Sequence, residues 1–148
     1  MADNSIRERI LLAVMAAARP AADGLGATLH RSPTVAISRE QCPALAVFPE
    51  SESISERAND RVTRELTMRV VALARSVPPA SPETEADRLL TAAHAALFAD
   101  GTFGGLALGI REQESEWEVE DADAVAVALP ARYRITYRTL AADLSTLG

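Results

Sequence analysis

Residues 125–137 read VAVALPARYRITY, and this stretch decides the fold class. Its odd positions are all apolar or aromatic, whereas its even positions after Pro130 carry arginine and threonine. Strict alternation of this kind is typical of a strand that buries one face. At about 3.3 Å per residue the strand would span roughly 43 Å, which exceeds what the core of a small domain requires. We therefore expect part of this strand to contact a neighbouring subunit.

The residues before this strand provide its partner. The chain from about 106 to 138 is predicted to form one long antiparallel hairpin that turns at residues 121–123, where Asp-Ala-Asp stands. The apolar positions change parity between Ile110 and Trp117, which predicts a bulge or a register shift near Arg111.

Two helices are predicted, each with a serine at its cap and an apolar stripe along one side. The first runs from about Ser5 to Ala18 and is expected to end before Pro20. The second runs from Ser81 to Phe98 and has a proline at its first position, where the missing N–H is not needed.

The region between the helices predicts further strands. The apolar run at residues 44–48 predicts a short buried strand that ends at Pro49, and the alternating pattern of residues 61–75 predicts a second long strand. The polar stretch between them, about 49–60, is expected to be a mobile loop. Residues 21–43 are expected to form a loop with at most one short strand.

The order helix, strands, helix, hairpin predicts an α+β fold. It is a mainly antiparallel sheet with long strands, flanked by two main helices. A chain of 148 residues with 48% hydrophobic content is expected to form one domain over residues 1–148.

Composition argues against several classes of protein. The sequence has no run of about 18 apolar residues and no secretory leader pattern, so we expect no membrane span and no secretion. Residues 1–75 carry 10 arginines and 9 acids, a net charge of +1, while residues 76–148 carry 5 arginines and 12 acids, a net charge of −7. An acidic half disfavours specific binding to DNA or RNA.

The sequence shows no catalytic or metal-binding pattern. His30, His94 and Cys42 are too few and too widely spaced for a recognisable metal motif. The glycine-bearing turns lack the Lys-Ser/Thr of a phosphate-binding loop, and no serine stands in a nucleophile-elbow pattern. We therefore expect no catalytic, cofactor-binding or metal-binding residues, and we expect that the protein is not an enzyme.

The most unusual polar feature is a row of five glutamates at every second position from 112 to 120. In one extended strand these carboxylates would project from one side, about 6 to 7 Å apart, and repel one another unless water or cations intervene. One interpretation is a solvated strand face that opposes edge-to-edge aggregation. The other is an acidic surface that faces a lumen or a basic partner.

A turn centred on Ala122 would place Glu112 opposite Arg132 and would let both Arg132 and Arg134 neutralise the acidic face. Trp117 would point to the other face, opposite Val127, either as a cap on the core or as an anchor in a subunit interface. The candidate interface residues are Glu112, Glu114, Glu116, Trp117, Glu118, Arg132 and Arg134.

Three segments carry a resemblance to a known family. They are Pro43-Ala-Leu-Ala-Val-Phe48, Ala92-Ala-His-Ala-Ala-Leu-Phe-Ala-Asp100 with the following Gly105-Leu-Ala, and Tyr133-Arg-Ile-Thr-Tyr-Arg-Thr139 with its short tail. With this layout nearly the whole chain resembles the tail terminator and minor tail proteins of long-tailed bacteriophages and prophages.

The resemblance implies a structural protein of the virion without cofactor or chemistry. It implies a homohexameric ring on the head-proximal end of the viral tail tube, which stops tube polymerisation and offers a docking surface for head-tail joining. The implied partners are further copies of the chain, the major tail tube protein and a head-completion or neck protein, with DNA passing through the channel without specific binding. Tail assembly would take place in the host cytoplasm.

Three questions stay open at the level of sequence. The acidic row could line the channel or contact the tube. The chain could instead be a head-tail connector or neck subunit of the same virion. A bacterial small-molecule-binding α+β domain is a further alternative, and it would show a ligand pocket.

Overall fold

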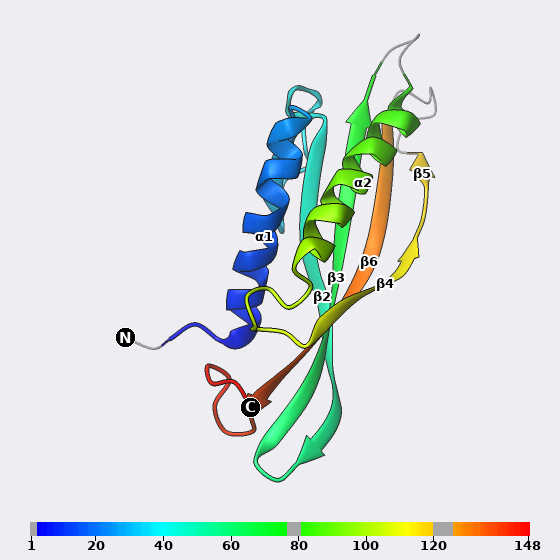
Figure 1. Ribbon diagram of the computed structural model, residues 1–148. Coiled ribbons are helices and arrows are strands. Elements are labelled where there is room, and N and C mark those ends of the chain that lie inside the picture. The colour runs from blue at the N-terminus through cyan, green and yellow to red at the C-terminus, as the bar shows by residue number, and fades with distance from the viewer. Residues whose placement is uncertain (1–2, 77–80, 120–125) are drawn as a thin grey trace.

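The computed structural model describes residues 3–76, 81–119 and 126–148 (Figure 1). The chain forms the predicted α+β fold. Its helices are α1 (Ile6–Gly24) and α2 (Pro82–Ala99), with a short 3₁₀ helix, η1 (Arg39–Gln41). Its strands are β1 (Thr28–Arg31), β2 (Ala44–Ala58), β3 (Arg61–Arg75), β4 (Gly109–Ser115), β5 (Glu118–Val119) and β6 (Ala126–Leu140).

The strands form one sheet in the order β1-β2-β3-β6-β4, and β5 also pairs with β6. The β1–β2 pair is parallel and every other pair is antiparallel. Both long helices lie on the same side of the sheet (Figure 1). We call the side under α1 and α2 the helix face and the opposite side the open face.

The main core lies between the sheet and the two helices. The odd positions of β6 from Val127 to Thr139 are all buried, so the predicted alternation is confirmed. Near its start β6 is buried on both faces, because Ala126, Ala128 and Pro130 are also covered. The fully buried side chains of this core include Ile6, Ile10, Val14, Leu45, Val47, Leu66, Met68, Leu89, Leu97, Tyr133, Ile135 and Tyr137.

Local signals placed the starts of both long helices and both bounds of β3 correctly. Ser5 caps α1 by accepting from the Glu8 N–H at 3.1 Å, and Ser81 caps α2 by accepting from the Thr84 N–H at 3.3 Å. Strand β3 covers the predicted 61–75 without change. The predicted end of the first helix at Ala18 is wrong, because α1 continues through Pro20 to Gly24.

The passage through Pro20 has a reason in packing. Proline inside a helix removes one backbone hydrogen bond and crowds the preceding turn. Ala18 and Ala22 stand on either side of it and are 2% and 0% exposed, respectively. Burial of this last turn against the core therefore offsets the local cost.

The predicted mobile loop at 49–60 is also wrong, because β2 runs through Pro49 to Ala58. The Val47 carbonyl accepts from the Ser32 N–H, so this side of β2 faces β1. Pro49 stands two residues further on and faces the same side, where β1 has already ended, so its missing N–H removes no sheet hydrogen bond. The hairpin closes at Asn59, whose φ is 58°.

This hairpin, and not the predicted C-terminal one, carries the strand length that exceeds the core. We call residues 51–65 the arm. Figure 1 shows the arm extending past the lower end of α1, together with the end of β6 that pairs with it. Nearly all β2 side chains in the arm are exposed.

The predicted hairpin over 106–138 is interrupted. Its first strand is divided into β4 and β5, with residues 116 and 117 between them. The Glu116 N–H donates to the Pro130 carbonyl at 3.0 Å, so Pro130 faces this side of the ladder and cannot return a hydrogen bond. The predicted turn at 121–123, together with Glu120 and Val125, lies outside the described residues.

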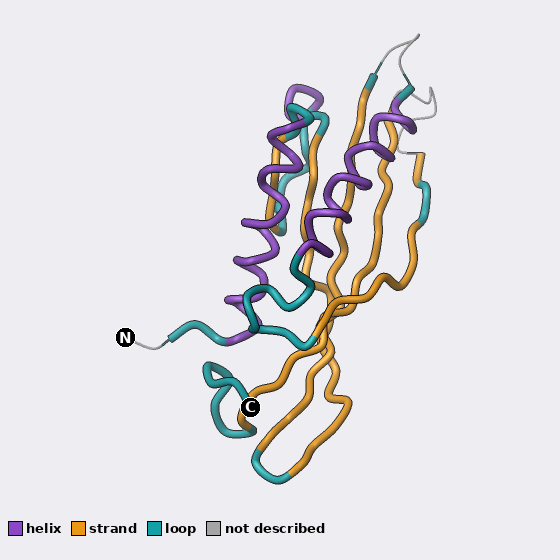
Figure 2. The backbone as a smooth tube through the Cα atoms, viewed as in Figure 1, coloured by secondary structure: helices purple, strands orange, loops and turns teal. Residues whose placement is uncertain are grey.

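No helix in the described part of the chain is long and apolar enough to cross a membrane. Figure 2 shows the arm continuing as paired strands beyond the layered part of the molecule, where the helices cover the sheet.

Candidate assembly surfaces

The glutamate row does not lie on one face of the sheet. A register shift between Glu112 and Glu114 pairs Glu112 with Tyr133 and Glu114 with Arg132. The Tyr133 side chain is buried on the helix face, where the Glu112 carboxylate lies 3.9 Å from His94 Nε2. Glu114, in contrast, bonds Arg132 on the open face. The predicted pairing of Glu112 with Arg132 is therefore wrong, because β5 pairs with β6 two residues out of the predicted register and the bulge at Gln113 reverses this by only one residue.

Arg132 joins three strands on the open face. Its guanidinium bonds Glu50 of β2 at 3.1 Å and Glu114 of β4 at 2.5 Å. Hydrogen bonds to Glu50 first, and to Glu114 second, raise the pKa of Arg132. The predicted neutralisation of the glutamate row by Arg132 thus holds for Glu114, while the share of Glu50 was not predicted.

Arg134 has a similar partner from another strand. Glu65 of β3 lies 3.4 Å from Arg134 and 3.1 Å from Arg111, so one carboxylate serves two arginines. Glu116 and Glu118 also stand on the open face, and neither has an ion-pair partner among the described residues. Of the predicted acidic row, these two described carboxylates lie on the open face without a neutralising arginine.

Trp117 lies in the gap between β4 and β5 and is 52% exposed. The predicted register, with Trp117 opposite Val127, is wrong, because Val119 pairs with Val127. A half-exposed indole at a sheet edge is available for contact with another molecule. Its role as an interface anchor stays a prediction.

A polar cluster on the helix face holds the base of the arm. The Glu52 carboxylate bonds Arg7 of α1 at 2.9 Å, lies 3.6 Å from Arg64 of β3 and accepts from the Tyr137 hydroxyl of β6. The Glu52 and Arg64 side chains are 15% and 12% exposed, respectively. We call these four residues the Glu52 junction. It unites four elements, and no local pattern in the sequence indicates it.

A second polar contact lies nearer the middle of the helix face. His94 Nδ1 and the Tyr133 hydroxyl are 2.9 Å apart, and the His94 ring stacks on Phe98 with centroids 4.5 Å apart. Burial, and then the charge of Glu112, raise the pKa of Tyr133 to about 12. His94 is thus a helix residue at the edge of the core.

These environments predict an alkaline limit to stability. Tyr133 and Tyr137 are the two tyrosines of the chain, and burial, followed by contact with Glu52, also raises the pKa of Tyr137. An unfolded tyrosine titrates near pH 10, so the unfolded state loses protons that the folded state retains. We expect full stability below about pH 10 and a loss as the pH rises through about 12.

The measurement is the ultraviolet absorbance of tyrosinate during an alkaline titration. In the native protein, tyrosinate should form only together with the loss of circular dichroism, whereas the urea-unfolded chain should titrate near pH 10. Native tyrosinate formation near pH 10, with the fold intact, would contradict this assignment.

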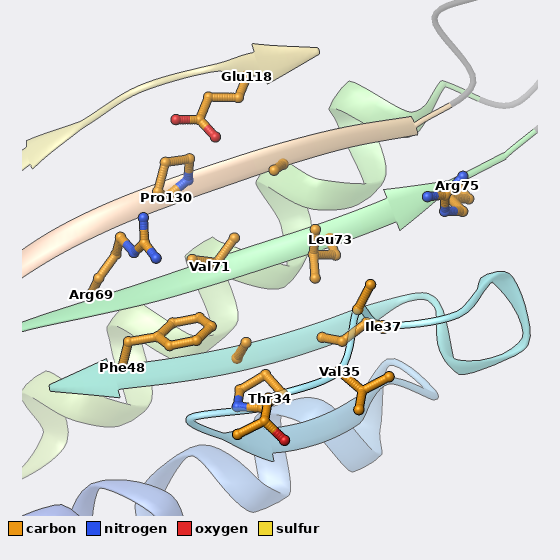
Figure 3. A pocket seen from close by; sticks show the side chains of 14 residues that line it. Thr34, Val35, Ile37, Phe48, Arg69, Val71, Leu73, Arg75, Glu118 and Pro130 are labelled. Carbon is orange, nitrogen blue, oxygen red and sulfur yellow. The ribbon is translucent and has the colours of Figure 1, made fainter. Parts of the chain in front are cut away.

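An apolar groove lies on the open face between the sheet and the loop that follows β1 (Figure 3). Its volume is about 320 Å³. Phe48, Val71 and Leu73 form its floor, and Val35 and Ile37 form the side contributed by the loop. Its rim carries the charged residues Arg69, Arg75 and Glu118.

Some groove residues have contacts within the chain, and others carry a charge or an apolar side chain that is at least partly exposed. The Arg69 guanidinium lies 4.9 Å from the Phe48 ring centroid, a cation–π contact. Arg75 has no ion-pair partner among the described residues. Val35 is 78% exposed, the highest value of any large apolar side chain in the described segments.

The structure brings no three metal-ligating side chains together within the described ranges. His30 Nε2 lies 2.8 Å from the Thr28 hydroxyl. The polar clusters described above join strands and helices, and the arm and the open face are surfaces of the described residues that are available for contact.

No family model matches the chain, and no curated protein is similar to it in sequence. Among solved structures, the fold is similar to that of a chain described as "Virion of native gene transfer agent (GTA) particle". The TM-score is 0.54 at 11% sequence identity, and the match covers 89% of this chain and 90% of the other. At this identity the comparison establishes a shared fold over nearly the whole length of both chains.

Proposed function

We propose that this chain is a structural protein of a phage-like virion and acts there without cofactor or catalysis. The observation that carries the proposal is the fold shared with a chain of a gene transfer agent virion over 89% of this sequence. The resemblance to tail terminator and minor tail proteins supports a finer role: a ring of six copies that caps the head-proximal end of the tail tube.

Two structural features support an assembly role. The arm carries paired strands past the helices, and its side chains are largely exposed. The open face leaves an apolar groove without a helix over it. Surfaces of this kind are typical of chains that are completed by other subunits.

The arm fits a head-to-tail arrangement in which it reaches the next copy. Such a contact is heterologous and gives a closed ring when the rotation between copies closes. Exposed Ile54, at 43%, is the apolar side chain that the arm would bring to a neighbour. In a ring the carboxylates of Glu116 and Glu118 would meet the tube or line the channel.

The direct test uses purified chain and tail tubes from the virus or element that encodes it. We expect the chain to bind one end of each tube, to appear there as a ring by electron microscopy and to stop further growth when tube subunits are added. Tubes that grow at the same rate with and without the chain would contradict the terminator role. Binding to portal or neck complexes, with none to tubes, would favour the head-tail connector.

A charge reversal tests the remaining acidic surface. Glu116 is exposed and unpaired among the described residues, so Glu116→Arg should leave the unfolding midpoint unchanged while lowering the yield of infectious or transferring particles at least tenfold. Asp87→Arg makes the same charge change at an exposed position of α2 and is the matched control. Equal particle yields from the two variants would leave the acidic surface without a function.

A further inference from the structure

Two stretches of the sheet edge, along β2 beyond the end of β1 and along β4 and β5, are poorly suited to strand addition by another molecule. The free edge of β2 contains Pro49 and two register shifts, at Pro49/Ser51 and Ile54/Glu56. The edge formed by β4 and β5 is bulged, interrupted at residues 116–117 and acidic. Prolines, bulges and charges at edges are the features by which proteins oppose edge-to-edge pairing.

The chain itself covers a third edge. At the end of β6, Thr139 forms a bridge with Leu147, and the Leu140 N–H donates to Thr146 at 3.1 Å. The Gly148 N–H donates to the Arg138 carbonyl at 3.3 Å. With these stretches of edge blocked, the apolar groove of the open face is a further surface available for contact between copies.

The open face carries a protrusion and a hollow side by side. Val35 stands exposed on the loop at one side of the groove, and Phe48, Val71 and Leu73 form the floor beside it (Figure 3). A patch with both features allows a two-fold contact, in which each copy offers the side chain that the groove of the other receives.

The rim of the groove carries charges of opposite sign that two copies related by a two-fold rotation could pair. Arg75 and Glu118 lie at different places around the groove, and neither has an ion-pair partner among the described residues. A two-fold rotation would bring Arg75 of each copy towards Glu118 of the other. Such rim pairs contribute little affinity when exposed, but they select the orientation of the contact.

We infer that the open face is a homodimer interface in which Val35 of each copy enters the groove of the other and Arg75 pairs with Glu118 across a two-fold axis. The two sheets would then pack face to face, with the helices on the outside, in the way that sheets pack in sandwiches. The contact goes beyond the proposed virion role and concerns the free chain, because Glu118 cannot pair with Arg75 across a two-fold axis and face the tube or the channel at the same time.

The test is the molar mass of the full chain in solution, measured by light scattering or sedimentation over a wide range of concentrations. One chain has a mass of 15.8 kDa, and we expect the mass to rise to that of two chains as concentration increases. Val35→Asp should weaken dimerisation at least a hundredfold, because it would bury a carboxylate in an apolar groove. Its exposed position should leave the fold unchanged, which circular dichroism checks.

Leu12→Asp is the matched control, because Leu12 is 48% exposed on α1, on the helix side of the sheet. This variant should dimerise like the unmodified chain. Arg75→Glu and Glu118→Arg should each weaken the dimer, and the double variant should recover at least part of the affinity. Recovery of this kind requires the two side chains to face each other across the interface.

Three results would overturn the inference. The first is a monomer at every concentration up to the solubility limit. The second is a dimer that Val35→Asp leaves intact, and the third is a double charge variant no stronger than either single one. A ring on tail tubes formed by a chain that fails this test would show that the virion role stands and the two-fold contact does not.

Discussion

Replacement of Ile135 by alanine should lower the free energy of unfolding by about 3 kcal/mol, within the usual range for removing a buried isoleucine side chain. Ile135 is 0% exposed and lies in the middle of β6, paired with Leu66 of β3 and Ile110 of β4. The surrounding side chains belong to paired strands and packed helices, so they can fill only part of the cavity. Domains of this size are typically stable by only about 5–15 kcal/mol, so a large fraction would be lost.

Urea denaturation followed by circular dichroism measures this change. The expected result is a lower midpoint with an unchanged slope, because the surface exposed on unfolding stays nearly the same. Leu12→Ala removes a similar side chain from an exposed site of α1 and should change stability by less than about 0.5 kcal/mol. A similar loss in both variants would mean that β6 does not form the centre of the core.

Replacement of Glu52 by alanine should cost about 2–3 kcal/mol, because it leaves Arg64 nearly buried without its carboxylate and Tyr137 without its acceptor. The value lies below that of a fully buried pair, since the Glu52 side chain is 15% exposed and water can enter in part. The loss should be concentrated at the base of the arm. Amide hydrogen exchange should therefore accelerate in residues 51–65 more than in α2.

Arg7→Ala is the natural comparison, because it removes another partner of the same carboxylate. The Arg7 side chain is 41% exposed, so water can replace it and the cost should stay below about 1 kcal/mol. If Glu52→Ala were no more harmful than Arg7→Ala, the Glu52 junction would not hold the arm. If exchange rose equally throughout the chain, the arm would not be a separate unit of local stability.

The arm also shows where reasoning from sequence reached its limit. Residues 50–60 are polar and follow a proline, a pattern that predicts a loop, yet residues 50–58 form the outer part of β2 and only residues 59 and 60 form the turn. Their pairing comes from β3, whose own alternation was correctly read over residues 61–75. A polar strand can be stable when its backbone pairs with a neighbour and one side chain, here Glu52, reaches a buried cluster.

A single β-bulge places the candidate interface residues on opposite faces of the sheet. An extra residue between Glu112 and Glu114 turns the strand over, because side chains alternate with a period of two. Glu112 then faces His94 on the helix face, while Glu114 stays on the open face and pairs with Arg132. Arg132 and Arg134 have further partners there, Glu50 of β2 and Glu65 of β3. The sequence predicted a bulge in this region, but its position decides which carboxylates share a face.

The sequence by itself determined what depends on near neighbours along the chain. Ser5 and Ser81 cap their helices, β3 keeps its predicted bounds, and the alternation that ends β6 buries Tyr133, Ile135 and Tyr137. Together these signals were sufficient for the α+β class.

Only the tertiary structure decided the features that depend on which backbone edge or face meets which neighbour. Pro49 costs the sheet no hydrogen bond, because β1 ends before reaching it. Pro130 interrupts the pairing along β6 between β4 and β5, because its nitrogen faces these strands and has no N–H to donate. The Glu52 junction and the groove beside Val35 each combine residues from distant parts of the chain. Their physical origin is packing between elements, which local periodicity and capping do not encode.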